Sequence, residues 1–308
     1  MEQINWCILG LIIQNIRCHP LCKIMRSPVE NLHYQVIPPH PLLATYIACY
    51  WILRTGAGQS RRELILPDGY AELILNYGAT YSWHDHGRQI KRDMKTVHLV
   101  GERDATILVE LRGGIQQVGV KFKPIGLFTL LRQPLNEISN QMLSPEELND
   151  PSLQLLYDQV KETPGDAASI ECLNTFFLNR LLVESLGDPV IGGAIHLILQ
   201  HQGNLRIDTL NSSLDVHYKV LERKFKTYVG LSPKTFARIV RFKHTYKQFH
   251  RIGHHDPSFF LDLGYYDQNH FIKDFKHFLH TTPSAYLRKQ RALSDEIVRR
   301  GLVERHDF

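Results

Sequence analysis

The stretch Leu221-x-Arg223-x-Phe225-Lys226 recurs fifty residues later as Phe271-x-Lys273-x-Phe275-Lys276. At the same offset, Ser232-Pro233 recurs as Thr282-Pro283. An apolar residue, a cation two positions on, and then an aromatic residue and a lysine predict a helix with a buried face and a cationic face. A hydroxyl residue before proline is typical of a helix start, because the hydroxyl caps a free N–H group and proline needs no donor there. The repeat therefore predicts two tandem helical units that contact neighbouring stretches of a long polyanion.

The distribution of charge agrees with a polyanionic partner. The chain has 308 residues, is 43% hydrophobic and carries a formal net charge of +5, which suits two domains with their own cores. Residues 190–308 carry 19 lysines and arginines against 11 acidic residues, whereas residues 1–189 carry 17 against 20. A basic C-terminal part beside a slightly acidic remainder favours nucleic acid as the partner.

The segment from Leu32 to Lys123 predicts a β-rich domain. Short runs rich in Ile, Leu, Val and Tyr are bounded there by Gly, Pro or Asp, which is typical of strands. About six strands within about ninety residues favour a small β-sandwich or a barrel-like domain. The clearest expected strands are 44–53, 63–66, 71–76, 106–111 and 116–122.

Two stretches between these strands predict hairpin turns. Leu66-Pro67-Asp68-Gly69-Tyr70 combines a proline that presets φ, an aspartate that can bond the backbone ahead, and a glycine that accepts a positive φ. Because apolar runs flank it on both sides, we expect a tight hairpin here. Arg112-Gly113-Gly114 is expected to form a second hairpin turn.

Helices are expected to follow the strands. One begins within 124–131, and Ser144-Pro145-Glu146-Glu147 fits a capping box. Residues 166–186 have the pattern of a long amphipathic helix, and its apolar stripe suits either packing on its own domain or a dimer seam. The stripe consists of Ile170, Leu173, Phe177 and Leu181.

Gly187-Asp188-Pro189 interrupts the helical pattern and predicts a domain boundary. We expect an α+β protein with two domains, of which the first is a β-sandwich or barrel-like domain with trailing helices and the second is entirely α-helical. The expected parts are residues 25–187 for the β-rich domain, 190–290 for the helical domain, and 291–308 for a C-terminal tail.

Residues 1–24 are interpreted as an upstream extension or a disordered tail. The apolar run from Trp6 to Ile13 is too short to span a bilayer and lacks the cationic start of a signal peptide. Met25 opens a more ordinary beginning. The sequence shows no other targeting or membrane segment, so the expected location is the cytoplasm.

Residues 232–249 predict a helix that connects the two repeated units, because apolar side chains recur there at helical spacing. Its eighteen or so residues would span about 27 Å at about 1.5 Å per residue. Successive major-groove faces on one side of a DNA duplex lie about 34 Å apart. A connecting helix of this length can therefore hold two reading heads about one turn of DNA apart.

Further motifs lie in a fixed order between Val216 and Tyr286. They are Leu221-Glu222-Arg223-Lys224-Phe225, Gly230-Leu231-Ser232-Pro233-Lys234, Arg238-Ile239-x-Arg241-Phe242, Leu263-Gly264-Tyr265-Tyr266-Asp267-Gln268, His270-Phe271-Ile272-Lys273-Asp274-Phe275-Lys276 and Thr282-Pro283-Ser284. In these motifs the chain resembles the AraC/XylS-type family of bacterial transcription regulators. The resemblance implies two helix-turn-helix motifs, joined by a linker helix, that insert recognition helices into adjacent major grooves.

The N-terminal part resembles the β-rich companion domain of a subset of that family. The matching residues are Pro67-Asp68-Gly69 and Val120-x-Phe122-x-Pro124. This resemblance implies a domain that senses a small-molecule effector or forms a homodimer and so modulates DNA binding. The implied partners are double-stranded DNA, a small-molecule effector, a second copy of the chain and, for an activator, RNA polymerase; no cofactor is expected.

Carried over by position, the resemblance implies two sets of DNA contacts. Arg and Lys suit the guanine edge, Asn and Gln suit adenine, and Glu can accept a bond from cytosine. Lysines and capped helix starts suit phosphates. The alternative for each residue is a solvated helix face, which Arg223 and Lys273 fit least because they match across the repeat. The implied base contacts are Lys219, Glu222, Arg223, Gln268, Asn269, His270 and Lys273, and the implied phosphate contacts are Lys226, Ser232, Lys276 and Ser284.

Four positions depart from the family pattern. Asn211 and Phe260 stand where a small alanine is usual at a helix crossing, and overpacking typically costs about 1–3 kcal/mol. His217 replaces a hydroxyl N-cap, whose loss costs about 1 kcal/mol. His280 replaces the glycine that would adopt a left-handed turn. Both motifs are therefore expected to be softer or more specialised than is usual.

Two other classes of function compete with DNA regulation. His84-Asp85-His86 has the H-x-H form of a cupin-like metal enzyme, but the carboxylate expected a few residues later is missing. Cys18 and Cys22 with Cys49 echo a zinc-thiolate, methyl-accepting site that lacks its fourth ligand. The other competitor is a protein-interaction module or a degenerate regulator without DNA binding, which would show no steep salt dependence of DNA affinity. The sequence favours a regulator that is not an enzyme.

Overall fold

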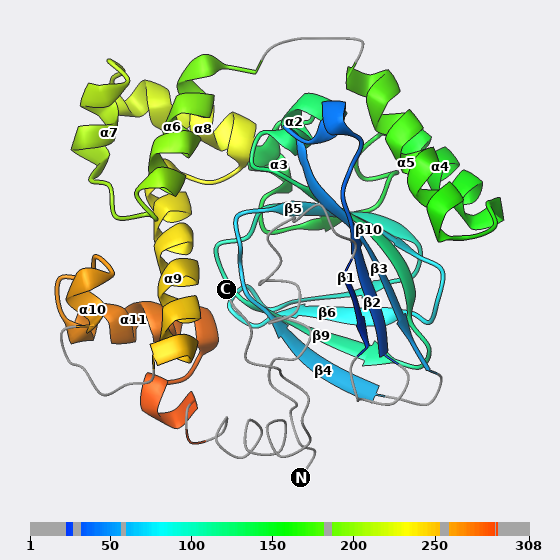
Figure 1. Ribbon diagram of the computed structural model, residues 1–308, viewed down its shortest axis with the longest axis horizontal. Coiled ribbons are helices and arrows are strands. Elements are labelled where there is room, and N and C mark those ends of the chain that lie inside the picture. The colour runs from blue at the N-terminus through cyan, green and yellow to red at the C-terminus, as the bar shows by residue number, and fades with distance from the viewer. Residues whose placement is uncertain are drawn as a thin grey trace.

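The structure is a computed structural model that describes residues 23–26, 32–56, 60–181, 187–252, 259–286 and 288. A β-rich part stands beside a helical part, and the long helix α9 (Pro233–Ile252) runs between two groups of helices (Figure 1). The expected α+β architecture is confirmed. The tail at 291–308 and the extension at 1–24 lie outside the described residues, except that Lys23 and Ile24 belong to strand β1 (Lys23–Arg26).

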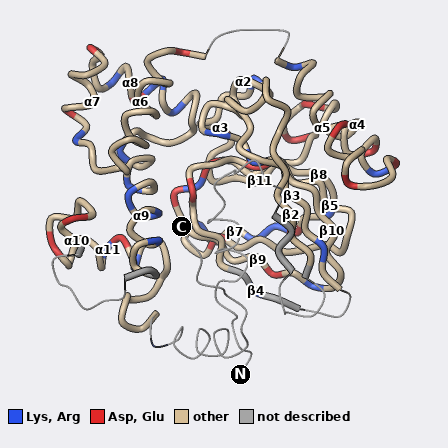
Figure 2. Tube along the Cα trace, viewed as in Figure 1, with Lys and Arg blue, Asp and Glu red and all other residues tan. Residues whose placement is uncertain are grey.

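The helical part contains two similar units on either side of α9. Helix α6 (Pro189–Gln200) begins after Asp188, whose Oδ1 accepts a bond of 2.9 Å from the Val190 N–H group. Lysines and arginines follow α9 along its length (Figure 2). Within the described ranges, no helix is long and apolar enough to cross a membrane. The helices besides α9 are α6 (Pro189–Gln200), α7 (Ile207–Ser213), α8 (Tyr218–Val229), α10 (Phe259–Asp262) and α11 (Gln268–Leu279).

The β-rich part consists of two antiparallel sheets. The expectation of a β-sandwich is confirmed, and the described strands form no closed barrel. The larger sheet contains, in spatial order, β1, β2 (Leu32–Ile37), β3 (Ile47–Thr55), β10 (Gln116–Phe122), β5 (Ala71–Asn76), β8 (Val97–Val100) and β11 (Met142–Leu143). The smaller sheet contains β4 (Ser60–Ile65), β9 (Ile107–Arg112), β6 (Tyr81–Asp85) and β7 (Ile90–Met94).

The two expected hairpins do not form. The stretch 66–70 joins β4 of the smaller sheet to β5 of the larger one, and 113–115 joins β9 to β10 in the same way. Gly69 and Gly113 do have positive φ values, of 80° and 90°. Turn chemistry therefore predicted the positive φ of both glycines but not the strand pairing, which depends on which sheet buries each strand and is not a local property. A hairpin does join β6 to β7, next to His84-Asp85-His86.

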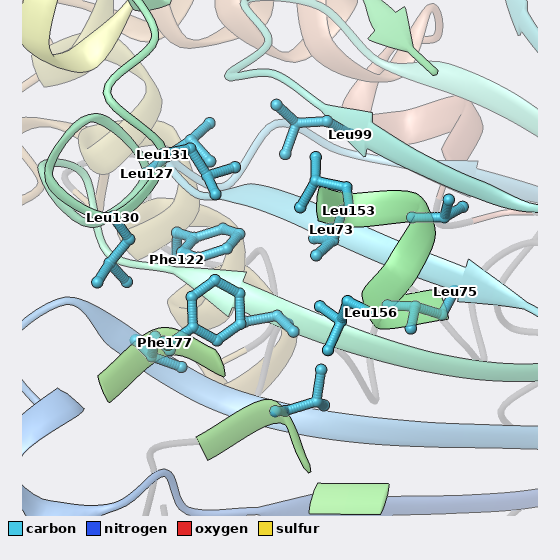
Figure 3. Packing of buried hydrophobic residues seen from close by; sticks show 14 of the residues in the cluster. Leu73, Leu75, Leu99, Phe122, Leu127, Leu130, Leu131, Leu153, Leu156 and Phe177 are labelled. Atoms are coloured by element: carbon cyan, nitrogen blue, oxygen red, sulfur yellow. The ribbon is translucent and has the colours of Figure 1, made fainter. Parts of the chain in front are cut away.

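One face of the larger sheet packs against helices of the same domain. Val118, Val120 and Phe122 alternate along β10 and belong to this core. Figure 3 shows Phe122 packed beside Phe177. Ile170, Leu173 and Phe177 of α5 are buried in it, and Leu181 packs at its edge. The apolar stripe therefore packs on its own domain, so these side chains are not available for a dimer seam. The covering helices are α2 (Gly126–Leu131), α4 (Pro151–Glu162) and α5 (Asp166–Leu181).

The capping box at Ser144 forms, but it does not begin a helix. The Ser144 N–H group donates to Glu147 Oε2 at 2.9 Å, and the Glu147 N–H group donates to Ser144 Oγ at 3.3 Å. The residues that follow form a turn, and α4 begins only at Pro151, where Asp150 is the cap. The same reciprocal bonds that start a helix are here used to close a surface turn.

A buried histidine should make the stability of the β-rich domain depend on pH. His98 of β8 is 3% exposed, its Nε2 contacts the Tyr81 hydroxyl, and its Nδ1 lies 3.0 Å from the Thr96 carbonyl oxygen. Burial lowers the pKa of His98 to about 4. Below the ordinary pKa of about 6.5, the unfolded chain therefore takes up a proton that the folded chain refuses. We expect this group to lower the unfolding free energy by about 3 kcal/mol between pH 7 and pH 4.

Urea unfolding of the wild type and of His98→Gln at pH 7, 5 and 4 measures this contribution. The glutamine variant should lose less stability than the wild type as the pH falls, since it has no imidazole to protonate. Equal pH slopes for the two proteins would contradict the assignment.

Candidate nucleic-acid interface

The first helix-turn-helix unit consists of α7 and α8. Leu221, Phe225 and Val229 are fully buried on one face of α8, whereas Lys219 and Arg223 are exposed. Helix α8 does have an N-cap, because Nδ1 of the preceding histidine accepts a bond of 3.3 Å from the Lys219 N–H group. The expected loss of this cap is therefore wrong: the imidazole nitrogen of His217 accepts the bond that a hydroxyl would accept.

The second unit repeats this design in α10 and α11. Phe271 and Phe275 are fully buried, whereas Lys273 is exposed on the same helix. Asp267 caps α11 through a bond of 2.7 Å from the His270 N–H group. Gln268, Asn269 and Lys276, which the sequence also assigned to DNA contact, are exposed.

The two recognition helices match in length and in the position of one cation. Both α8 and α11 have 12 residues and end at a residue with a left-handed backbone, Gly230 and His280. Arg223 lies six residues after the cap of α8, and Lys273 lies six residues after the cap of α11. The repeat in the sequence is thus a repeat in space, with one exposed cation at the same place on each helix.

Three of the predicted contact residues have partners within the protein. Glu222 lies 3.1 Å from the Lys226 ammonium group in an ion pair that is partly exposed. His270 is half-buried, with its Nε2 3.3 Å from Arg241 Nη2 and its ring against the edge of Tyr265. These side chains must exchange a partner in order to contact DNA, whereas no hydrogen bond or ion pair of the exposed Arg223 or Lys273 side chain is found among the described residues.

The two hydroxyl residues proposed as capped helix starts differ. Ser232 Oγ accepts a bond of 3.1 Å from the Thr235 N–H group and caps α9. Ser284 caps nothing, because the residue that accepts the bond from the Ala285 N–H group is Thr282, at 3.2 Å. The expectation that Ser284 caps a helix is therefore wrong. Ser284 is exposed within the helical turn 283–286, and the cap is Thr282, directly before Pro283.

The remaining departures from the family pattern are accommodated in different ways. Phe260 stacks on Phe271, with ring centroids 4.3 Å apart, so its ring becomes part of the core. Asn211 Oδ1 is buried and has no hydrogen-bond partner in the described structure. His280 adopts the left-handed conformation expected of glycine, with φ 53°. A side chain in this region costs more than glycine would, so the second unit carries some backbone strain.

An ion-pair bridge that the sequence did not reveal connects α9 to α11. Asp274 is 2% exposed, and its two carboxylate oxygens accept bonds of 2.8 Å from Arg238 Nε and 3.1 Å from Arg241 Nη2. Helix α9 has 20 residues, which corresponds to about 30 Å. One sequence feature could have indicated this bridge. Asp274 lies beside Phe275 on the apolar face of an amphipathic helix, where an unpaired charge would be costly.

Two family models match the chain. One, described as a helix-turn-helix domain, matches residues 211–289, which include both recognition helices and α9. Residues 211–289 belong to the AraC-type helix-turn-helix family. The other model, described as a domain of unknown function (DUF6597), matches residues 35–144 of the β-rich part. No curated protein matches the chain.

Several solved structures are similar to this chain. A structure of ToxT from Vibrio cholerae has 11% identity and a TM-score of 0.43, and the match covers 77% of this chain and 97% of that chain. ToxT from Vibrio cholerae bound to an unsaturated fatty acid has 16% identity and a TM-score of 0.40, covering 85% and 97%. KdgF from Halomonas sp. has 7% identity and a TM-score of 0.24, covering 32% and 84%.

The β-rich part contacts the first unit of the AraC-type domain at the end of its recognition helix. The ring of Phe128 lies 4.2 Å from that of Tyr228, measured between centroids. Ser139 Oγ donates a bond of 2.6 Å to the carbonyl oxygen of Gly230. These contacts involve the C-terminal end of α8, whereas Lys219 and Arg223 in its first two turns are exposed.

A second set of contacts joins the β-rich part to α9 and α11. Lys243 Nζ donates to the carbonyl oxygen of Asp68 at 3.2 Å. The Thr106 hydroxyl donates to the carbonyl oxygen of Phe278, and His277 Nε2 lies 3.1 Å from the carbonyl oxygen of Asp104. The β-rich part therefore contacts both recognition helices at their C-terminal ends, whereas the predicted base contacts lie in their N-terminal halves.

The residues considered for metal chemistry have other contacts. Among the described side chains, no group of three His, Cys, Asp or Glu residues is arranged to hold a metal ion. Asp85 is paired with Arg88 at 2.9 Å, and His84 Nε2 lies 3.6 Å from Glu110. Cys49 is buried, and Cys18 and Cys22 lie outside the described residues.

Proposed function

We propose that this protein is a sequence-specific DNA-binding transcription regulator whose helices α8 and α11 enter adjacent major grooves. The observation that carries the proposal is the matched pair Arg223 and Lys273, each exposed six residues after the cap of a 12-residue helix. In a helix-turn-helix, the N-terminal residues of the second helix contact base edges. The AraC-type family match and the basic charge of residues 190–308 support it.

In this proposal the contact residues divide by chemistry. The exposed cations Lys219, Arg223 and Lys273 suit guanine, and Gln268 and Asn269 suit adenine. Lys226 and Lys276 lie further along their helices and suit phosphates. Glu222 and His270 would contact bases after leaving Lys226 and Arg241, and Ser232 and Ser284 remain proposed phosphate contacts. The DNA-binding domain is assigned to residues 190–290.

Alanine substitutions at the matched cations test the base contacts. We expect Arg223→Ala and Lys273→Ala each to weaken binding to an operator, selected from random duplex DNA, by about 1–3 kcal/mol. Each should relax the base preference at a different position, with the two positions about one helical turn of DNA apart. The measurement is a gel-shift titration against the operator and its point variants, with Lys161→Ala, an exposed lysine of α4, as the control. Equal losses on all sequences would make both residues phosphate contacts.

Salt dependence separates this proposal from a protein-interaction function. A regulator that neutralises several phosphates should lose affinity steeply as salt rises, since each contact releases counterions. We expect the slope of log K against log salt to fall in magnitude for Lys226→Ala and Lys276→Ala. No DNA binding by the wild-type chain at low salt would refute the proposal.

The β-rich domain, assigned to residues 25–187, is proposed to modulate DNA binding in response to a small-molecule effector. It contacts Tyr228 and Gly230 at the end of the first recognition helix, and His277 and Phe278 at the end of the second. A change of shape in this domain would thus act on both helices together. Operator affinity with and without the effector measures this coupling.

A further inference from the structure

A cavity lies between the two sheets of the β-rich domain, with a volume of ≈ 80 Å³. On the corresponding scale a single water molecule needs about 10–15 Å³, so this cavity has room for a small organic molecule. Most of its wall is apolar, and its apolar residues include Ile74, Val100, Ile107, Val109 and Leu111. The cavity opens between β10 and β3 of the larger sheet and β9 of the smaller sheet.

Three side chains that line this cavity have N–H groups with few or no hydrogen-bond acceptors among the described residues. The Nε1 atom of Trp51 and the Nε2 atom of Gln117 are buried and have no partner among the described residues. Arg103 is 8% exposed, and among the described residues its guanidinium makes one hydrogen bond, of 3.4 Å, to the carbonyl oxygen of Ile65. A guanidinium has five N–H donors and is rarely buried unless it is paired. The cavity wall therefore offers these donors, the two cations Arg103 and Lys121, and the carboxyl groups of Asp68 and Glu72.

The nearby carboxyl groups of Asp68, Glu72, Glu102 and Asp85 act on Arg103 only at longer range. Within the described structure, no carboxylate oxygen forms an ion pair with it. Asp68 is paired with Lys121, whose ammonium group also lies 3.3 Å from Glu72. Burial raises the pKa of Glu72 and, more strongly, that of Glu102, which favours their neutral forms. The Arg103 guanidinium is therefore left in the cavity wall with most of its N–H donors without a partner among the described residues.

The strand β10 sets the length and direction of the cavity. Gln117 and Lys121 point into it from one strand and are four residues apart, which is about 13–14 Å. Gly119 lies between them, and the Trp51 indole packs directly against its backbone. A Cβ atom at this position would lie 2.0 Å from the indole, so only glycine leaves room for it. The charged end lies beside Asp68, whose carbonyl oxygen accepts from Lys243 of α9. The cavity thus runs from a cationic end near the DNA-binding domain, past an indole, to an amide.

We propose that this cavity binds an amphipathic monocarboxylate, with the carboxylate on Arg103 and the apolar body along Trp51 toward Gln117. A carboxylate matches the fork of a guanidinium and accepts several bonds at once. An alcohol offers no charge to Arg103, and an organic cation would be repelled by it. The role of such a ligand as the effector rests on the proposed function, but its binding to the β-rich domain does not.

The test uses the full-length chain and three probes of equal chain length: octanoate, 1-octanol and octylammonium. Binding is followed by Trp fluorescence, since Trp51 lines the cavity, and by the shift of the thermal midpoint. Octanoate is expected to bind and to raise the midpoint, with octanol weaker and octylammonium without effect. Equal binding of octanol, or preferential binding of octylammonium, would overturn the assignment to a carboxylate.

Substitutions then locate the site. Arg103→Met should weaken octanoate binding by about tenfold or more, because a charge-assisted bond is lost. Arg103→Lys should restore part of the octanoate affinity. Lys91→Met should leave the affinity unchanged, because Lys91 is an exposed cation of β7. Trp51→Phe keeps an aromatic ring and removes the Nε1 donor, so it should weaken binding by a smaller factor.

The stability of the Arg103 variant without ligand gives a second readout. Removing an unpaired buried cation should leave the thermal midpoint unchanged or raise it. A large fall would show that Arg103 has a structural partner and would overturn the proposal, as would unchanged octanoate binding. Operator binding is measured in parallel without any probe. If octanoate does not bind, the proposed DNA-binding function still stands; if the operator does not bind, the assignment of the cavity still stands.

Discussion

Replacing Asp274 with alanine is expected to destabilise the chain by about 3 kcal/mol, because it breaks the ion-pair bridge between α9 and α11. The Asp274 carboxylate is buried and accepts from both Arg238 and Arg241. Without it, the Arg241 guanidinium, whose side chain is 16% exposed, loses its anionic partner in a poorly solvated place. The expected cost lies at the lower end of the range for a broken buried pair, since Arg238 remains partly exposed to water.

Urea unfolding measures this loss, and Asp262→Ala provides the matched control, since Asp262 is an exposed aspartate of α10 in the same unit. The functional consequence is equally specific. Helix α11 loses a connection that fixes it on α9, so footprinting of Asp274→Ala should retain protection of the first half-site and lose the second. A variant as stable as Asp262→Ala, with both half-sites protected, would contradict the bridge.

Replacing Lys121 with methionine is expected to cost about 3–5 kcal/mol, because it leaves a buried carboxylate without its partner. Lys121 is 6% exposed, pairs with Asp68 and Glu72, and lies over the ring of Tyr70. Burial opposes the ionisation of Asp68, but Lys121 and Lys243 outweigh it and lower the Asp68 pKa. Ionised Asp68 therefore adds to the free energy of unfolding at any pH above its pKa in the unfolded chain, about 3.9. This stabilisation is lost as the pH falls through its lower pKa in the folded chain.

Lys123→Met is the control for this substitution, because Lys123 is exposed two residues after Lys121. The double variant Lys121→Met with Asp68→Asn should recover much of the lost stability, since it removes the orphaned charge together with its partner. Asp68 also accepts from Lys243 through its carbonyl oxygen, so Lys121→Met should loosen the contact between the domains. Hydrogen exchange at residues 66–70 and in α9 measures that effect. Equal stabilities for the two lysine variants would refute the prediction.

Much of the helical part could be predicted because its signals are local. The caps at Asp188 and Ser232, the left-handed Gly230 and the apolar spacing of α8 and α11 all act within a few residues. The expected cost of His217 was wrong for a local reason too, since an imidazole nitrogen can accept the bond that a hydroxyl accepts. The roles of the predicted base contacts remain predictions that the binding experiments test.

The amino-acid sequence by itself determined where five of the described strands and the helices α5, α8, α9 and α11 lie, and which cations recur at equal places on α8 and α11. These features depend on side-chain periodicity, capping and turn chemistry, which operate between neighbours in the chain. Only the tertiary structure decided that residues 66–70 pass from one sheet to the other, that Asp274 joins two arginines, and that Arg103 lines a cavity without a carboxylate partner. Each of these depends on the burial and pairing of groups far apart in sequence, where the surroundings of a charge set its free energy.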